Sequence, residues 1–216
     1  KFHAAQAEYE LREFDKARPA LGELREARNE SVTATGDPAD TNTVGKLEWF
    51  PSVWIMLAEI DLQQKQYDDV AATVAAFREA APDSPYLYLA DDVLGRSLNN
   101  QGKFDEARDV FRRVTESKSG EKTETAAKCQ FFLANTYFHQ KNYEKAIAEF
   151  LKVDILYDFP EYQSASLLSV GMCEEKLNHW DKAAEAYRDL LQRFPQSKHV
   201  DDAKARLAEI KTKASS

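Results

Sequence analysis

Residues that could do chemistry are few in this sequence, and their spacing does not assemble a catalytic or metal site. The four histidines are His3, His139, His179 and His199. His139 and His179 fall near successive predicted turns and could approach each other, but a metal ion needs further ligands and none is spaced to supply them. Phosphate-binding glycine patterns, H-E-x-x-H and a nucleophile elbow are absent from the sequence. We therefore expect no metal, no cofactor and no catalytic residue.

The two cysteines, Cys129 and Cys173, are expected to be buried free thiols. They fall near the start of one predicted helix and near the end of a parallel neighbour, with an offset of seven residues between repeats. That offset corresponds to about 10 Å along the helix axis. A disulfide needs Cα atoms within about 7 Å of each other.

The net charge and the lack of long apolar runs argue against two kinds of partner, nucleic acid and the membrane interior. The net charge is −8 and charged residues make up 31% of the chain, which argues against a basic groove for nucleic acid. No run of 18 apolar residues exists, so we expect no membrane insertion by this segment. The chain begins with Lys1 rather than Met, inside an apparent helix, so we expect it to be a piece of a longer protein.

An eight-residue phrase recurs five times and shows which elements would position any functional side chain. The copies are FDKARPAL from Phe14, YDDVAATV from Tyr67, FDEARDVF from Phe104, YEKAIAEF from Tyr143 and WDKAAEAY from Trp180. Their aromatic residues are separated by 53, 37, 39 and 37 positions, a period typical of solenoids. Apolar residues at i, i+3 and i+4 lie on both sides of each phrase, so each repeat should be two helices joined by a short turn.

Each letter of the phrase has a physical role. The aromatic ring should fill the corner between the two helices. The acids that follow should lie in the first turn of the second helix, where the helix dipole favours negative charge: Asp15, Asp68, Asp105, Glu144 and Asp181. A small residue should then let the helices approach closely: Ala17, Ala107, Ala146 and Ala183. Four residues later a larger side chain should pack into the neighbour: Leu21, Phe111, Phe150 and Tyr187.

This pattern resembles the tetratricopeptide repeat, whose consensus is W-x2-L-G-x2-Y, then A-x3-F, then P. The matching first-helix residues are Trp54 and Leu57, Leu94 and Gly95, Leu133 and Tyr137, and Gly171. The second-helix matches are Ala107/Phe111, Ala146/Phe150 and Ala183/Tyr187, with closing prolines at Pro82, Pro160 and Pro195. The resemblance implies an all-α, right-handed solenoid of about five helix-turn-helix repeats with a C-terminal capping helix.

The predicted segments follow from this register. They are repeat 1 (1–31, degenerate), an inserted loop (32–45), repeat 2 (46–83), repeat 3 (84–121), repeat 4 (122–161), repeat 5 (162–197) and a capping helix with tail (198–216). The turn formers from Asn29 to Gly45 are either a partner-binding loop or a tolerated insertion. In the capping helix, Val200, Ala203, Leu207 and Ile210 form one apolar side. The other side should face water and carries Asp201, Asp202, Lys204, Arg206, Glu209 and Lys211.

Two departures from the consensus are visible. The spacing of 37 to 39 residues exceeds the usual 34, which indicates longer helices or connections. The connections AAPDSPYLYLADD and RFPQSKHVDDAKARLAEI resemble those of bacterial cell-envelope members of the superfamily. That resemblance favours a periplasmic or cell-envelope location over the cytoplasm.

The resemblance implies that the first helices line a concave surface that binds protein partners. The helical wheel places the following residues on that surface: Ile55, Glu59, Leu62 and Gln63; Asp92, Arg96, Asn99 and Asn100; Phe131, Asn135, Phe138 and His139; and Leu168, Met172, Glu175 and Lys176. The aromatic and aliphatic members would form an apolar patch beside a polar strip, as in grooves that bind a peptide or helix, unless curvature or neighbouring helices cover the rings. Asp92 and Arg96, four residues apart, should pair with each other.

One specific site of the family is missing from the sequence. Some members grip the terminal carboxylate of heat-shock chaperones with a lysine and asparagine clamp, but the positions for its lysine hold Ile55, Asp92, Phe131 and Leu168. We therefore predict a non-enzymatic scaffold that binds a peptide or helix of a partner protein in the concave groove. The alternatives are a regulatory array of an enzyme whose catalytic domain lies outside this chain, or a self-association module.

Overall fold

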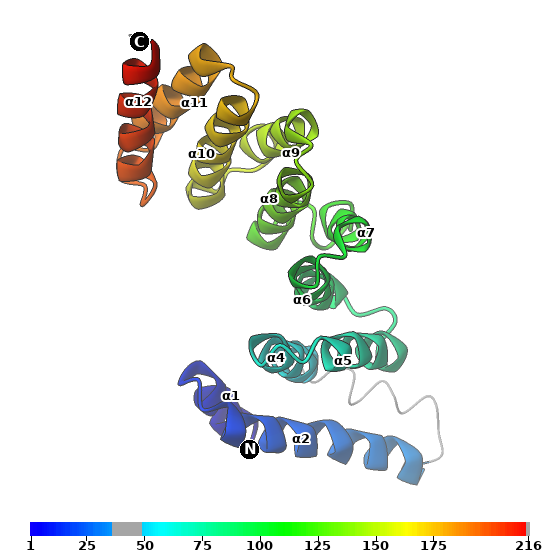
Figure 1. Ribbon diagram of the computed structural model, residues 1–216. Helices are drawn as coiled ribbons and strands as arrows, with labels where there is room; N and C mark the ends of the chain where they lie inside the picture. The colour runs from blue at the N-terminus through cyan, green and yellow to red at the C-terminus, as the bar shows by residue number, and fades with distance from the viewer. Residues whose placement is uncertain (36–48, 215–216) are drawn as a thin grey trace. The chain divides into compact units, whose positions relative to one another are not determined.

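The computed structural model describes residues 1–35 and 49–214. These residues form eleven α-helices and no strand, which confirms the all-α prediction (Figure 1). They divide into two compact units, an N-terminal unit of Lys1–Gly102 and a C-terminal unit of Lys103–Ser216. The division falls inside the predicted third repeat, between its two helices.

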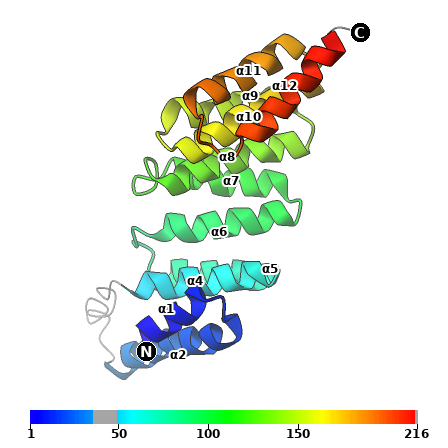
Figure 2. The same ribbon diagram turned by 90° about the vertical axis from the view of Figure 1, so that its left-hand side faces the viewer.

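The N-terminal unit contains five helices: α1 (Phe2–Glu10), α2 (Phe14–Thr35), α4 (Phe50–Gln63), α5 (Tyr67–Ala80) and α6 (Leu87–Asn100). Helices α1, α2 and α4 lie beside one another (Figure 2) and share one apolar cluster, which contains fully buried Ala5, Leu21 and Val53. Helices α4, α5 and α6 share another, where the rings of Trp54 and Phe77 stack with centroids 6.0 Å apart. Each hairpin therefore buries its apolar sides against the next one.

The C-terminal unit contains six helices: α7 (Phe104–Thr115), α8 (Glu124–His139), α9 (Tyr143–Leu156), α10 (Pro160–Lys176), α11 (Trp180–Arg193) and α12 (Val200–Ala214). Each helix packs against the next in sequence, and α10 also contacts α8. In Figure 1, α8 and α10 lie on one side of this unit and α7 and α9 on the other. Helix α12 packs on α11 through buried Ala203 and Ile210, which confirms the predicted capping helix.

The repeated phrase plays the structural role that its residue types predict. Its acids lie in the first turns of α2, α5, α7, α9 and α11. Its small residues and the larger ones four positions later are all fully buried: Ala17, Ala107, Ala146 and Ala183, and Leu21, Phe111, Phe150 and Tyr187. These residues form the interior that holds paired helices together.

The five turns between paired helices share one backbone feature that the residue types do not reveal. The residue two positions before the repeated aromatic always has a positive φ, between 59° and 75°: Arg12, Lys65, Gly102, Lys141 and Asn178. This left-handed residue ends the first helix and lets a following amide bond back to a carbonyl in its last turn. At Lys141, for example, the next amide donates to the Tyr137 carbonyl at 2.9 Å. Only one of the five positions holds glycine, which adopts this conformation without strain.

Gly171 permits a close approach between α10 and α11 in the C-terminal unit. A Cβ atom at this position would lie 2.2 Å from Cε1 of Tyr187 on α11. The Tyr187 ring is fully buried, and its hydroxyl donates to Glu175 at 2.5 Å. The glycine of the consensus is therefore required here, because the Tyr187 ring occupies the space that a side chain would need.

Three details differ from or complete the predictions. Helix α2 continues to Thr35, so residues 32–35 are helical and the predicted loop at 32–45 starts too early; its remainder lies outside the described residues. Arg206 was expected on the water-facing side of the capping helix but is half-buried and binds Glu175 of α10 at 3.1 Å. Cys129 and Cys173 are buried and unlinked, as predicted, and burial raises the pKa of the Cys173 thiol to about 12.

Candidate protein-interaction surface

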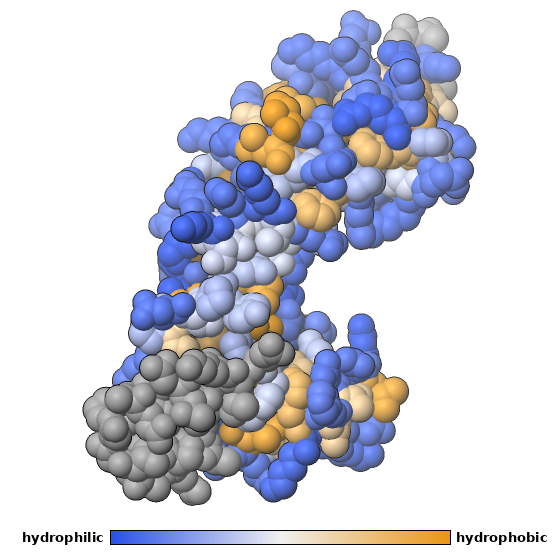
Figure 3. Space-filling view, turned by 180° about the vertical axis from the view of Figure 1, so that it is seen from behind, coloured by the Kyte–Doolittle hydropathy of each residue, from blue (hydrophilic) through white to orange (hydrophobic). Residues whose placement is uncertain are grey.

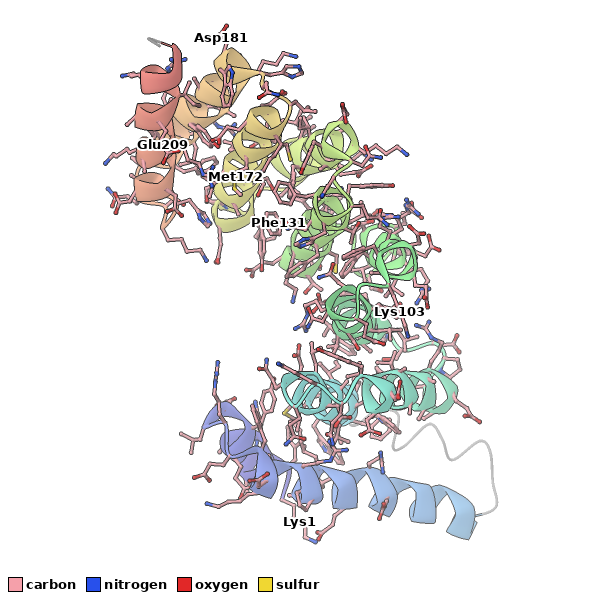
Figure 4. The ribbon with its side chains drawn as sticks, viewed as in Figure 1. Lys1, Lys103, Phe131, Met172, Asp181 and Glu209 are labelled. Carbon is pink, nitrogen blue, oxygen red and sulfur yellow. The ribbon has the colours of Figure 1, made fainter. Side chains whose placement is uncertain are left out.

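The predicted interaction residues of the C-terminal unit lie on α8 and α10. Helix α8 carries Phe131, Asn135, Phe138 and His139, and α10 carries Leu168, Met172 and Glu175. His139 is exposed and the other six are half-buried. Figure 4 shows Phe131 and Met172 on neighbouring helices. We call Phe131, Phe138, Leu168 and Met172 the α8–α10 strip.

The Phe131 ring packs against interior rings and is also partly exposed to solvent. Its ring centroid lies 5.4 Å from that of buried Phe150 on α9 and 6.4 Å from that of Tyr162 on α10. It also meets the adjacent Phe132 edge-on at 5.9 Å, and Phe132 stacks on Phe111 of α7 at 6.0 Å. Part of the Phe131 ring therefore supports the packing of α8, α9 and α10, and the rest remains accessible to solvent.

Phe138 occupies the other end of the strip, at the last turn of α8. Its ring meets Tyr143 at 5.5 Å in an edge-on geometry and His139 at 6.1 Å. The His139 ring stacks on Phe104 of α7 at 5.7 Å. These rings form a partly exposed aromatic corner beside the turn between α8 and α9.

Leu168 and Glu175 are both engaged within the protein. Leu168 packs on the apolar cluster that α10, α11 and α12 share. The Glu175 carboxylate accepts the Tyr187 hydroxyl and a guanidinium hydrogen bond from Arg206. Burial, followed by these contacts with Glu175, raises the pKa of Tyr187. Glu175 therefore anchors the capping helix, and only part of its carboxylate remains for a partner.

In the N-terminal unit, the predicted surface is more polar and more closed. Arg96 donates to Asp92 on its own helix, which confirms the predicted pair, and also to Glu59 on α4. Leu62 and Asp92 are buried, at 6% and 3% exposure, so neither can meet a partner without rearrangement. Ile55 and Asn99 are half-buried. This part of the predicted surface is held together by its own ion pairs.

Nothing in the described part of the chain assembles a metal centre or a membrane span. Residues 1–35 and 49–214 contain no cluster of three or more His, Cys, Asp or Glu able to hold a metal ion. Within the same ranges, none of the helices is long and apolar enough to cross a membrane. The sequence suggested that His139 and His179 could approach each other. In the structure, Nδ1 of His179 lies 2.8 Å from Oε2 of Glu174.

Comparisons with known proteins agree with the repeat pattern. Two models of the tetratricopeptide repeat match the chain, one over residues 93–165 and the other over residues 165–197. The chain is a tetratricopeptide repeat protein. These matches cover most of the third repeat and all of the fourth and fifth, which include the α8–α10 strip. No curated protein matches the chain by sequence.

Solved structures share the fold of this chain at low sequence identity. BtubC from P. vanneervenii has a TM-score of 0.70 and 12% identity, over 94% of this chain and 84% of that one. The C-terminal part of a TPR repeat-containing protein from Cytophaga hutchinsonii gives 0.68 and 12%, over 97% and 70%. A tetratricopeptide repeat protein from Parabacteroides merdae gives 0.60 and 18%, over 76% of this chain and 60% of that one.

Two aromatic residues of this surface were missed by the sequence analysis. Phe132 and Tyr162 form a continuous set of ring contacts with Phe131, across α7, α8 and α10. The helical wheel treats each helix by itself, so it did not group a residue at the start of α10 with one on α8. The adjacent phenylalanines at 131 and 132 were the available signal, because two neighbouring rings on one helix face two different neighbouring helices.

Proposed function

We propose that this tetratricopeptide repeat protein is a non-enzymatic scaffold that binds a peptide or helix of a partner protein across the α8–α10 strip. The single observation that supports this most is the exposure of the strip. Four large apolar side chains on two neighbouring helices are only half-buried, whereas the repeated apolar residues of the interior, such as Phe150 and Tyr187, are fully buried. Apolar side chains gathered in this way are typical of helix-binding and peptide-binding grooves.

The charged groups of the predicted surface support a binding role rather than a catalytic one. Glu175 is held by Tyr187 and Arg206, and Glu59 and Asp92 are held by Arg96. A general acid or base needs a proton that it can exchange with a substrate. These carboxylates are instead committed to internal ion pairs: Glu175 ties α10, which carries part of the strip, to α12, and Glu59 and Asp92 hold α4 and α6 together.

Other features of the proposal rest on composition and resemblance. The net charge of −8 favours a protein partner over nucleic acid. The style of the connections between repeats favours a location in a bacterial cell envelope. If the strip mediates self-association instead, the partner is a second copy of this chain. Light scattering of the purified chain would detect the resulting oligomer.

Phe131 is a poor probe of binding because it also supports the fold. Truncating a fully buried phenylalanine costs about 3–5 kcal/mol, so a half-buried one should cost roughly half of that. Met172 is the better probe, because it is half-buried and its substitution removes apolar surface without removing a polar bond. Leu156, which is 64% exposed on α9, offers a matched control away from the strip.

The test is a selection of displayed peptides on the intact chain, followed by affinity measurements with the selected peptides. Met172→Gln should weaken binding by about tenfold, since a covered aliphatic side chain contributes roughly 1.5 kcal/mol or more. Leu156→Gln should leave the affinity unchanged. Equal affinity of the wild type and Met172→Gln for every selected peptide would remove the strip from the binding surface.

A further inference from the structure

Helix α9 carries an apolar stripe on a side that the α8–α10 strip does not use. Ile147, Leu151 and Ile155 are each four residues apart, so they lie along one side of the helix. Ile147 is half-buried, Leu151 is 37% exposed and Ile155 is 75% exposed. Exposure thus rises along the stripe toward the end of the helix. The stripe spans about 12 Å, or just over two helical turns.

The first two residues of this stripe line a groove between α9 and α11, and Ile155 lies beyond its lining. Ile147 and Leu151 line the groove together with Leu167 and Val170 of α10 and Ala186 of α11, and its volume is about 550 Å³. Figure 3, which views the molecule from behind, shows hydrophobic side chains gathered on the upper part of this face. We call this feature the α9–α11 groove. Glu174, Asp189 and Gln192 also line it.

The opposite wall of the groove carries charge. Lys182, Glu185 and Arg188 on α11 line it at a spacing of three residues, and all three are exposed. The structure gives none of these three an ion pair with another described residue. Asp189 beside them does pair, with Arg193 at 3.0 Å. The α9–α11 groove therefore has an aliphatic wall and a wall with a positive, negative, positive order of charge.

The size of the exposed apolar surface distinguishes between possible occupants. A fully covered aliphatic side chain removes roughly 100 Å² from water, so the exposed part of the stripe supplies at most a few hundred Å². A stable interface between two copies needs about 800 Å² from each partner. The groove is too small to hold a dimer together, but a single helix in a groove needs only three or four anchoring side chains.

We propose that the α9–α11 groove binds an amphipathic helix of a partner protein. The aliphatic face of that helix lies on Ile147, Leu151 and Ile155. Beside that face, the partner helix carries an acidic, a basic and an acidic residue, which face Lys182, Glu185 and Arg188 respectively. This site is separate from the α8–α10 strip, because Leu167 and Val170 lie on a different side of α10 from Leu168 and Met172. The scaffold would then hold two partners on one unit.

The experiment uses the intact chain and a displayed library of peptides of about 16 residues, long enough for four helical turns. Leucines are fixed along one face, and the positions beside them vary between glutamate and lysine. The expected result is enrichment of peptides with acids at the two positions that face Lys182 and Arg188. Recovery of peptides with no charge preference, or of none above background, would overturn the proposal.

Two sets of substitutions then locate the binding of an enriched peptide. The double substitution Leu151→Glu with Ile155→Glu should weaken it by at least about tenfold. Leu156→Glu makes the same change on the same helix, but off the stripe, and should have little effect. The double substitution Lys182→Glu with Arg188→Glu should instead shift the selection toward peptides with lysine at the positions beside the leucines. This variant also tests the site if Leu151→Glu with Ile155→Glu does not fold.

The outcomes also separate this site from the α8–α10 strip and from self-association. Met172→Gln should not change the affinity of a peptide that binds in the α9–α11 groove. The proposal for one site can therefore be refuted while the proposal for the other stands. Light scattering should show the same mass for the wild type and for Leu151→Glu with Ile155→Glu. A dimer that only the wild type forms would show that the occupant is a second copy, which would overturn the assignment to a partner helix.

Discussion

Substituting Gly171 by alanine perturbs a close contact between α10 and α11. The added Cβ would lie 2.2 Å from Cε1 and 2.5 Å from Cζ of Tyr187, which is well inside van der Waals contact. The ring cannot retreat freely, because it is fully buried and its hydroxyl is held by Glu175. Since Glu175 also binds Arg206 of α12, a shift of the ring disturbs the capping helix as well.

The expected magnitude follows from two contributions. Overpacking a closed interior by one methyl group costs about 1–3 kcal/mol. If the ring turns away, the loss of a hydrogen bond to a charged group adds about 1.5–3 kcal/mol. Alanine recovers up to about 1 kcal/mol through its higher helix propensity. We therefore expect Gly171→Ala to destabilise the C-terminal unit by about 2–4 kcal/mol, a large share of the total for a domain.

Trp180 provides a selective assay, because it is the only tryptophan of the C-terminal unit; the others are Trp49 and Trp54. Urea unfolding followed through its fluorescence should show an earlier transition for Gly171→Ala. Hydrogen exchange should show faster opening of α11 and α12 than of α7 and α8. Gly22→Ala is the matched control, because no atom lies within 4 Å of the Cβ it would add. It should be neutral or slightly stabilising.

An unchanged transition for Gly171→Ala would refute the reasoning, because it would mean that α10 and α11 are not in close contact at this glycine. A second check is the double variant Gly171→Ala with Tyr187→Leu. Once the ring is gone, the added methyl group has room, so the glycine substitution should cost less than about 1 kcal/mol in that background. An equal cost in both backgrounds would assign the effect to something other than the ring.

Three further outcomes are expected. Lys141→Gly should stabilise the C-terminal unit by about 1 kcal/mol in urea unfolding, because glycine adopts the φ of 60° without strain; a destabilised variant would contradict the turn geometry. Asp61→Ala should destabilise the N-terminal unit by about 2–3 kcal/mol, since it leaves the half-exposed Arg18 without its buried carboxylate, and hydrogen exchange should then quicken in α2. The C-terminal unit should lose stability in alkali. Burial raises the pKa of Cys173 from 9.0 to about 12 and that of Tyr157 from 10.0 to about 12, so the unfolded chain releases these protons first. Stability from this source is complete below about pH 9 and lost as the pH rises to about 12; a flat unfolding free energy over that range would contradict it.

The repeated phrase was enough to predict the helices and much of the interior. The buried alanines and the larger residues four positions later lie where the spacing places them, because both positions face the partner helix in every hairpin. The turns were located correctly, but not their conformation. Lys65 and Asn178 adopt positive φ although neither residue type demands it, since the packing of the two helices fixes the turn.

The candidate surface was harder to predict, because a helical wheel describes one helix at a time. Leu62 and Asp92 fall on the expected side of their helices, but neighbouring helices cover both of them. Tyr162 joins Phe131 only through the packing of α10 on α8. The apolar stripe of α9 escaped notice because the resemblance directed attention to the first helix of each repeat, and α9 is a second helix.

The most direct measurement of the proposed binding role is photo-crosslinking of a selected peptide to the intact chain. A photoreactive residue in place of Met172 should crosslink a peptide whose affinity Met172→Gln weakens, while one in place of Leu156 should not. Mass spectrometry would then place the contacts of the peptide on α8 and α10. Equal crosslinking at both positions, or crosslinks confined to position 156, would contradict a partner site on the α8–α10 strip.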